Sequence, residues 1–176
     1  AMDSPGNIYF LRRYTASGTI LKLSPGGAVL DSFRIWNGKY PGGLAWDGTH
    51  LWFSIYYPNP ECGLYKLDFP SKTVIDALLV PTLQPYGMTW DGSTLMYVEN
   101  GFDGGARGTL RVDPATGDTT GFIPEPADGT SNGTSPRDAA WDGRYLWLLA
   151  EPVGASSGRA LYKYDLGGGG TPVIGL

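Results

Sequence analysis

The chain has 176 residues, a net charge of −4 and a single cysteine, Cys62. No block of Lys and Arg occurs, which argues against a nucleic-acid partner, and no long apolar run occurs, which argues against a membrane span. One cysteine excludes an internal disulfide and a thiolate metal cluster. The 27 glycines, 14 prolines and 13% aromatic residues favour many short strands joined by tight turns.

The first unit of the chain, residues 3–36, is predicted to form three strands. They are expected at residues 8–11, 19–23 and 28–33. Only Met2 and Asp3 stand where the later units carry a Trp-Asp pair. The first unit is therefore expected to lack its innermost strand.

Three later units, expected at residues 41–80, 85–124 and 136–176, share a Trp-Asp-Gly triplet. In each unit a short strand a ends at the Trp, a tight Asp-Gly turn follows, and strands b, c and d complete an antiparallel sheet. The predicted strands are 44–46, 51–55, 64–68 and 74–79; 88–90, 95–98, 109–112 and 119–123; and 139–141, 145–149, 160–164 and 172–175. Repeats with periods of roughly 20–50 residues form solenoids or propellers. The prediction is an all-β propeller of four repeats in a single domain, residues 1–176.

The repeated pattern carries a family resemblance. Gly-Leu-Ala-Trp-Asp-Gly-x-x-Leu-Trp at residues 43–52 is echoed at residues 87–96 and 138–147, and Leu-Tyr-Lys-Leu-Asp follows the first copy. This pattern resembles bacterial β-propeller repeats of the YncE-like, NHL-like and glutamine-cyclotransferase-like kinds, over nearly the whole chain. The resemblance implies a propeller fold and an extracytoplasmic or secreted location. It does not choose a function, because such folds host lyases, cyclases, lactonases, lectins and protein-binding platforms.

Side chains that recur in every later unit are predicted to be structural. The tryptophans at positions 46, 90 and 141 are expected to pack between sheets, as are residues 52, 96 and 147. The aspartates at positions 47, 91 and 142 are expected to accept backbone hydrogen bonds in the turn.

The variable connections define the expected working face. The b–c connections span residues 12–18, 56–63, 99–108 and 151–159, and the d–a connections span residues 36–40, 81–85 and 124–135. Because antiparallel strands reverse direction each time, both sets lie on one rim, and variable loops on a rigid scaffold commonly bind ligands. Five aromatic residues on this rim do not recur and are expected to form a contact platform: Trp36, Tyr40, Tyr56, Tyr57 and Phe102.

Eight residues on that rim are the candidate ligand-binding residues. Tyr86, Arg137 and Asp138 are expected to converge on the mouth of the central channel. The others lie at the ends of the b strands: Arg13, Tyr56, Glu99, Asn100 and Glu151. The alternative interpretation is that these charges simply pair with one another.

No cofactor is predicted. Residues 99–105 are rich in oxygen ligands and are an alternative calcium site, but they lack the regular spacing of an EF-hand loop. The only histidine, His50, falls in an a–b turn on the opposite rim, which argues against a Ser-His-Asp triad on the working face. Residues 132–134 match a glycosylation acceptor and mark residues 124–135 as exposed.

Three functions stay open on the sequence alone. The first is a non-catalytic module that binds a protein or a carbohydrate. The second is an enzyme of the cyclotransferase, lyase or glycoside-active type, in which Glu99 acts with Glu151 or Asp138, and Arg137 stabilises an anion. The third is an excised or engineered propeller fragment that self-associates, as a homo-oligomer completing a larger ring.

Overall fold

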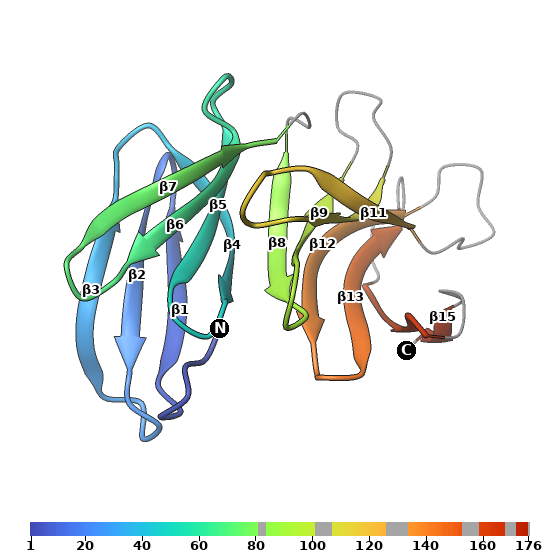
Figure 1. The fold of residues 1–176 in the computed structure, drawn as a ribbon, viewed down its shortest axis with the longest axis horizontal. Coiled ribbons are helices and arrows are strands. Elements are labelled where there is room, and N and C mark those ends of the chain that lie inside the picture. Colours follow the sequence, from blue (N-terminus) through green and yellow to red (C-terminus); the bar gives the residue numbers. More distant parts are fainter. Residues whose placement is uncertain (81–83, 101–106, 126–133, 153–158, 168–171, 176) are drawn as a thin grey trace.

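The computed structural model describes residues 1–80, 84–100, 107–125, 134–152, 159–167 and 172–175. These residues form strands and no helix, so none of them belongs to a helix long enough to cross a membrane. The predicted all-β class and its four repeats are confirmed (Figure 1).

The strands form four antiparallel sheets, and within each sheet they follow one another in chain order. Sheet 1 has three strands: β1 (Ile8–Tyr14), β2 (Ser17–Leu23) and β3 (Val29–Ile35). Sheet 2 has β4 (Tyr40–Trp46), β5 (Leu51–Tyr57), β6 (Gly63–Asp68) and β7 (Thr73–Leu79). Sheet 3 has β8 (Pro85–Trp90), β9 (Leu95–Glu99), β10 (Gly108–Val112) and β11 (Thr119–Pro124). Sheet 4 has β12 (Thr134–Trp141), β13 (Tyr145–Pro152), β14 (Ala160–Asp165) and β15 (Pro172–Gly175).

The Asp-Gly turns between the first two strands of sheets 2 to 4 have the predicted chemistry. Asp47 Oδ1 accepts hydrogen bonds from the backbone N–H groups of Thr49 and His50, at 2.8 and 2.7 Å. Gly48 has a φ of 98°, in the left-handed region that glycine adopts without strain. Asp47 Oδ2 also accepts a bond from the indole N–H of Trp52, at 2.8 Å. Asp47 therefore holds both the turn of the hairpin and the indole ring of Trp52 in place.

Sheet 1 lacks a full inner strand, as predicted. Only a remnant is present: Met2 bridges to Ile8, and Ala1 and Tyr9 exchange two backbone hydrogen bonds of 2.8 and 3.2 Å. Asp3 takes the place of the turn aspartate and accepts the backbone N–H of Asn7, at 2.8 Å. The Met2-Asp3 pair thus occupies the position of the later Trp-Asp pairs.

The inner strands begin earlier than the sequence predicted. The prediction started β4 at residue 44, but the strand begins at Tyr40, and β8 and β12 likewise begin at Pro85 and Thr134. The Pro-Gly-Gly segment, which the prediction left outside the strand, is irregular strand with register shifts between Pro41 and Leu44. A Cβ atom at Gly43 would lie 2.5 Å from the backbone nitrogen of Met88. The glycine is there because neighbouring inner strands touch through their backbones.

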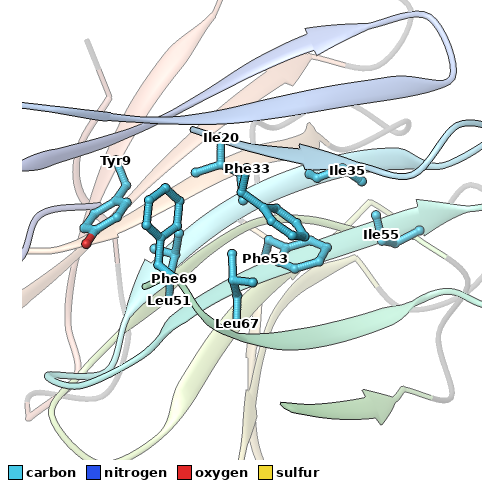
Figure 2. Packing of buried hydrophobic residues seen from close by; sticks show 9 residues of the cluster. All are labelled: Tyr9, Ile20, Phe33, Ile35, Leu51, Phe53, Ile55, Leu67 and Phe69. Atoms are coloured by element: carbon cyan, nitrogen blue, oxygen red, sulfur yellow. The ribbon is translucent and has the colours of Figure 1, made fainter. Parts of the chain in front are cut away.

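Three apolar clusters join consecutive sheets. Figure 2 shows the first, in which Tyr9, Ile20 and Phe33 of sheet 1 pack against side chains of sheet 2 that include Leu51 and Phe53. A second cluster joins sheets 2 and 3, and a third joins sheets 3 and 4. Within the described residues, no buried cluster joins sheet 4 back to sheet 1.

Each recurring tryptophan packs between sheets, as predicted, on one side of its ring, whereas its other side lines a pocket. Trp46, Trp90 and Trp141 are half-buried, and each packs against one of the three clusters. Trp46 also stacks on Tyr9 with ring centroids 5.4 Å apart. Their other sides line a pocket of about 340 Å³ that Met2 completes. The four equivalent residues therefore surround the central axis at the end where the Asp-Gly turns lie.

Candidate functional site

The variable connections gather at the opposite end from these turns, and we call that end the loop face. It is formed by the ends of β1, β5, β9 and β13 and by the starts of β4, β8 and β12. In Figure 1 the connection from β5 to β6 lies at the top of the molecule and the N-terminus lies well below it. The strand order places both kinds of variable connection on this face.

A pair of stacked tyrosines lies near the centre of the loop face. The rings of Tyr56, on β5, and Tyr86, on β8, are 4.5 Å apart and tilted by 15°. On the sheet 1 side, Arg13 donates a hydrogen bond to the Tyr56 hydroxyl oxygen at 2.8 Å, and its guanidinium carbon lies 5.3 Å from the ring centroid. Two rings and one cation thus bridge three sheets.

Arg137 extends this arrangement onto sheet 4. Its guanidinium carbon lies 5.6 Å from the Tyr86 ring centroid, and its Nε donates to Glu151 Oε2 at 3.0 Å. Glu151 also accepts a bond from Arg159 Nε at 2.8 Å. We call Arg13, Tyr56, Tyr86, Arg137 and Glu151 the arginine–tyrosine row. It crosses all four sheets, and each of its members was a candidate from the sequence.

Neighbouring groups shift the pKa values of two members of the row, Glu151 and Tyr86. Burial works to raise the pKa of Glu151, but the hydrogen bonds and charges of Arg137 and Arg159 outweigh it and lower that pKa. Burial, with Tyr56 next to it, raises the pKa of the Tyr86 hydroxyl. Glu151 is therefore an anion and Tyr86 a neutral hydrogen-bonding group, which suits recognition better than proton transfer.

The aromatic surface continues beyond the row. Tyr40 lies 5.8 Å from Tyr56 and 5.2 Å from Tyr57, measured between ring centroids, and Tyr57 is exposed. Trp36 is 46% exposed but packs on Phe53, away from this group. The tyrosines at positions 40, 56 and 57 thus lie together, Phe102 lies outside the described residues, and their use as a contact platform stays a prediction.

Sequence analysis did not identify Ser54, the residue that positions Tyr86. The Ser54 hydroxyl is fully buried, accepts the backbone N–H of Gly43 at 2.8 Å and donates to the Tyr86 carbonyl at 2.7 Å. It links sheet 2 to the inner strand of sheet 3. One signal in the sequence could have identified Ser54: it is polar, whereas the other b strands carry an apolar residue at the equivalent position.

Asp138 lies apart from the row, in the channel. With Arg13, Gly42 and Met88 it lines a pocket of about 360 Å³ beside the inner edge of β1. The side chain is exposed to that pocket, yet the surrounding protein raises its pKa by burial, against the opposing effects of the Ala139 N–H and the charged N-terminus. The three residues expected to converge at the channel mouth therefore do not all meet there. Tyr86 and Arg137 belong to the row, whereas Asp138 lines the channel pocket.

Glu99 and Asn100 are the least exposed of the candidates. Glu99 is 4% exposed and pairs through its backbone with Gly108, and Asn100 is 6% exposed and hydrogen-bonds to Tyr86. Residues 101–105 of the alternative calcium site lie outside the described residues, and the described ones hold no cluster of three metal-ligating side chains. Calcium binding there stays a prediction.

No protein-family model matches the sequence, and no curated protein matches it. Solved structures are similar along nearly the whole chain. Glutaminyl cyclase of Myxococcus xanthus superposes with a TM-score of 0.71 at 16% identity, covering 98% of this chain and 66% of its own. The WD40 domain of Neurospora crassa Pan2 gives 0.60 at 9%, covering 98% and 52%, and a nidogen/laminin complex gives 0.66 at 11%, covering 96% and 61%.

The chain is a four-bladed β-propeller. Sheets 1 to 4 are its blades, and the loop face is one face of the disc. This propeller spans 66% or less of the length of each of those three chains. Identities this low establish the fold that the sequence resemblance implied and leave the function to the residues of the loop face.

Proposed function

We propose that this propeller is a non-catalytic binding module whose arginine–tyrosine row receives an acidic segment of another protein. The observation that supports it is the unbroken row across the four blades, from Arg13 to Glu151. Stacked tyrosines offer large, rigid contact area, and arginine binds carboxylates through two hydrogen bonds at once.

Charge on the loop face favours an acidic ligand, although the whole chain is negative. Arg12 and Arg13 are both exposed at the end of β1, and Arg159, whose Nε binds Glu151, keeps 70% of its side chain exposed. Arg12 lies over the ring of Tyr14, with 5.1 Å from its guanidinium carbon to the centroid. Guanidinium groups held against aromatic rings keep hydrogen-bond donors available to a partner. One of the similar structures is itself a complex of nidogen with laminin, which makes a protein ligand the first choice.

A display library of random peptides tests the proposal. Selection on the wild-type chain is expected to enrich acidic sequences, and the double variant Tyr56→Ala/Tyr86→Ala is expected to weaken their binding roughly tenfold or more. Tyr145→Ala is the matched control, because Tyr145 lies on the opposite face beside Arg144 and Lys163. Enriched peptides that bind the double variant as tightly as the wild type would contradict the proposal.

Two alternatives are tested alongside. A glycan array on the same three proteins tests a carbohydrate ligand, for which the tyrosines would serve as stacking platforms.

The enzyme alternative rests on Asp138, whose raised pKa and place in the channel pocket fit a general acid. Turnover of a cyclisation or glycoside substrate that disappears in Asp138→Asn would favour the enzyme. The extracytoplasmic location stays a prediction.

A further inference from the structure

The channel pocket of about 360 Å³ is lined by residues of all four blades. Its volume is near the lower end of the range for small-molecule sites, roughly 300–1,000 Å³. The strand pairing orders its lining along the channel. Phe10 of blade 1, Leu44 of blade 2 and Met88 of blade 3 lie at one level, and Asp138 of blade 4 lies one residue nearer the loop face. Arg13 lies further toward that face, three residues after Phe10 on β1. The pocket is therefore charged toward the loop face and apolar further down.

Asp138 occupies a position that other blades fill with glycine. Gly43 and Gly87 each stand three residues before the recurring tryptophan of their blade, and Asp138 stands there in blade 4. A Cβ atom at Gly87 would lie 2.1 Å from Asp138 Oδ1, so the glycine leaves room for the carboxylate. Because the repeat is built elsewhere without a charge at this position, the carboxylate is not needed to hold a blade together. This favours a role in binding.

The carboxylate of Asp138 has bonding capacity that a ligand can use. Within the described part of the chain, its one hydrogen bond comes from the Ala139 N–H to Oδ1 at 2.9 Å, and no side-chain cation forms an ion pair with it. The charged N-terminus acts on it electrostatically but donates a hydrogen bond to the Tyr9 carbonyl oxygen at 3.2 Å. The protein around Asp138 raises its pKa by burial. A carboxylate in such surroundings is stabilised by a cationic group of a ligand.

Arg13 supplies the opposite charge. Its Nη2 donates to the Tyr56 hydroxyl oxygen at 2.8 Å, and the guanidinium carbon lies 5.3 Å from the centroid of that ring. These contacts hold the guanidinium in place. The bond to Tyr56 is its one hydrogen bond to the described residues, so other N–H groups of Arg13 can bind a ligand. Arginine binds a carboxylate through two parallel hydrogen bonds.

Phe10 brings a large apolar side chain to the pocket. It is 52% exposed, whereas its equivalent in blade 2, Phe53, is fully buried. Leu44 and Met88 line the pocket at the same level, and Ala140 on the blade 4 side adds only a methyl group. An apolar group of a ligand placed here would remove apolar surface of both molecules from water.

We propose that this pocket binds an α-amino acid with an apolar side chain. The charged side chains of the lining are one carboxylate and one guanidinium, which match the two charges of a zwitterion. The ammonium group of the ligand binds Asp138, and its carboxylate binds Arg13. The apolar side chain points down the channel toward Phe10 and Met88.

This site goes beyond the protein ligand proposed for the arginine–tyrosine row. Arg13 belongs to both, so an amino acid in the pocket and an acidic segment on the row would share its guanidinium. Asp138 and the apolar lining lie outside the row, and they would bind an amino acid whether or not the row binds a protein.

Isothermal titration calorimetry of the wild-type chain with L-phenylalanine and L-leucine tests the proposal. Three analogues each lack one feature: N-acetyl-L-phenylalanine has no ammonium group, L-phenylalaninamide has no carboxylate, and glycine has no apolar side chain. Each analogue is expected to bind roughly tenfold or more weakly than L-phenylalanine, because each leaves one part of the pocket without its partner.

A variant assigns the ammonium group to its partner. Asp138→Asn is expected to weaken binding of L-phenylalanine roughly tenfold or more and to leave the weaker binding of N-acetyl-L-phenylalanine unchanged. A merely structural effect would weaken both ligands alike. Asp118→Asn is the matched control, because Asp118 is an exposed carboxylate in the β10–β11 hairpin, and it should bind as the wild type does.

The wild-type comparison alone can overturn the proposal. It would fail if neither amino acid bound at millimolar concentration, or if N-acetyl-L-phenylalanine bound as tightly as L-phenylalanine. It would also fail if Asp138→Asn, shown by thermal unfolding to be folded, bound L-phenylalanine as tightly as the wild type. Acidic peptides that still bound the row in those cases would leave the proposed function standing.

Discussion

The aspartate of each Trp-Asp-Gly triplet does more than form a turn. Asp91 accepts backbone N–H bonds from Ser93 and Thr94 at 2.9 and 2.7 Å, and it pairs with Arg111 on β10 at 2.5 Å. The turn role followed from the sequence, because Asp-Gly chemistry is local. The ion pair with Arg111 did not, because it depends on which side chain the next hairpin brings to the turn.

Removal of this carboxylate should destabilise the blade in a pH-dependent way. Burial opposes ionisation of Asp91, but its hydrogen bonds prevail and lower its pKa from 3.8 to about 2. A lowered pKa in the folded state means that the stabilisation is complete well above pH 3.8 and is lost as the pH falls toward 2. Asp91→Ala is therefore expected to lower the free energy of unfolding by about 2 kcal/mol at pH 7, with a smaller difference at pH 3.

Urea unfolding at the two pH values measures this effect. Asp118→Ala, an exposed carboxylate in the β10–β11 hairpin, is the control and should change stability by less than about 0.5 kcal/mol. A difference for Asp91→Ala that is the same at pH 3 and pH 7 would show that the carboxylate's charge plays no part.

At the scale of the element, the inner strands are where sequence and structure differ most. Strands b, c and d carry β-branched and aromatic residues, and their positions were predicted to within a few residues. The start of β4 was predicted four residues late, because Pro41, Gly42 and Gly43 have low strand propensity. Gly42 and Gly43 allow close contact with the backbone of the neighbouring blade. A local sequence pattern cannot predict that contact, because the two blades are far apart in the sequence.

The same distinction holds for the loop face. The sequence supplied the members of the arginine–tyrosine row, because non-recurring residues on variable connections could be singled out. It did not supply the stacking of Tyr56 on Tyr86, nor the support from Ser54, because these residues belong to different blades. Only the spacing between blades brings them within reach.

Because the inner strands are in close backbone contact, we expect alanine substitution to destabilise the fold at Gly43 but not at Gly26. A Cβ at Gly43 would lie 2.5 Å from Met88 N and 2.7 Å from Gly87 Cα, both backbone atoms that cannot rotate away. Gly43→Ala is therefore expected to destabilise the fold by about 2–3 kcal/mol, by forcing blades 2 and 3 apart. At Gly26 the nearest atom, Ser24 Oγ, lies 3.8 Å from the built Cβ, so Gly26→Ala should be nearly neutral. Thermal unfolding compares the two variants, and equal melting temperatures would contradict the packing argument.

At the scale of the whole molecule, stability is expected to be uneven, because three apolar clusters of the described residues join the four blades. Each blade contacts its sequence neighbours, so the array resembles a linear repeat protein in which terminal units have one interface fewer. Blades 2 and 3 are covered on both broad sides. Among the described residues, blade 4 packs against another blade only on the side that faces blade 3, and Trp147 and Leu149 on its other side are partly exposed.

This difference in coverage should appear in the hydrogen exchange of backbone amides. β9 and β13 are equivalent second strands, each paired on both edges, by β8 and β10 or by β12 and β14. Because β9 lies between two apolar junctions and β13 borders one, amides of residues 145–150 are expected to exchange roughly tenfold faster than those of residues 95–99. Equal protection of the two strands would mean that the blades unfold as one cooperative unit.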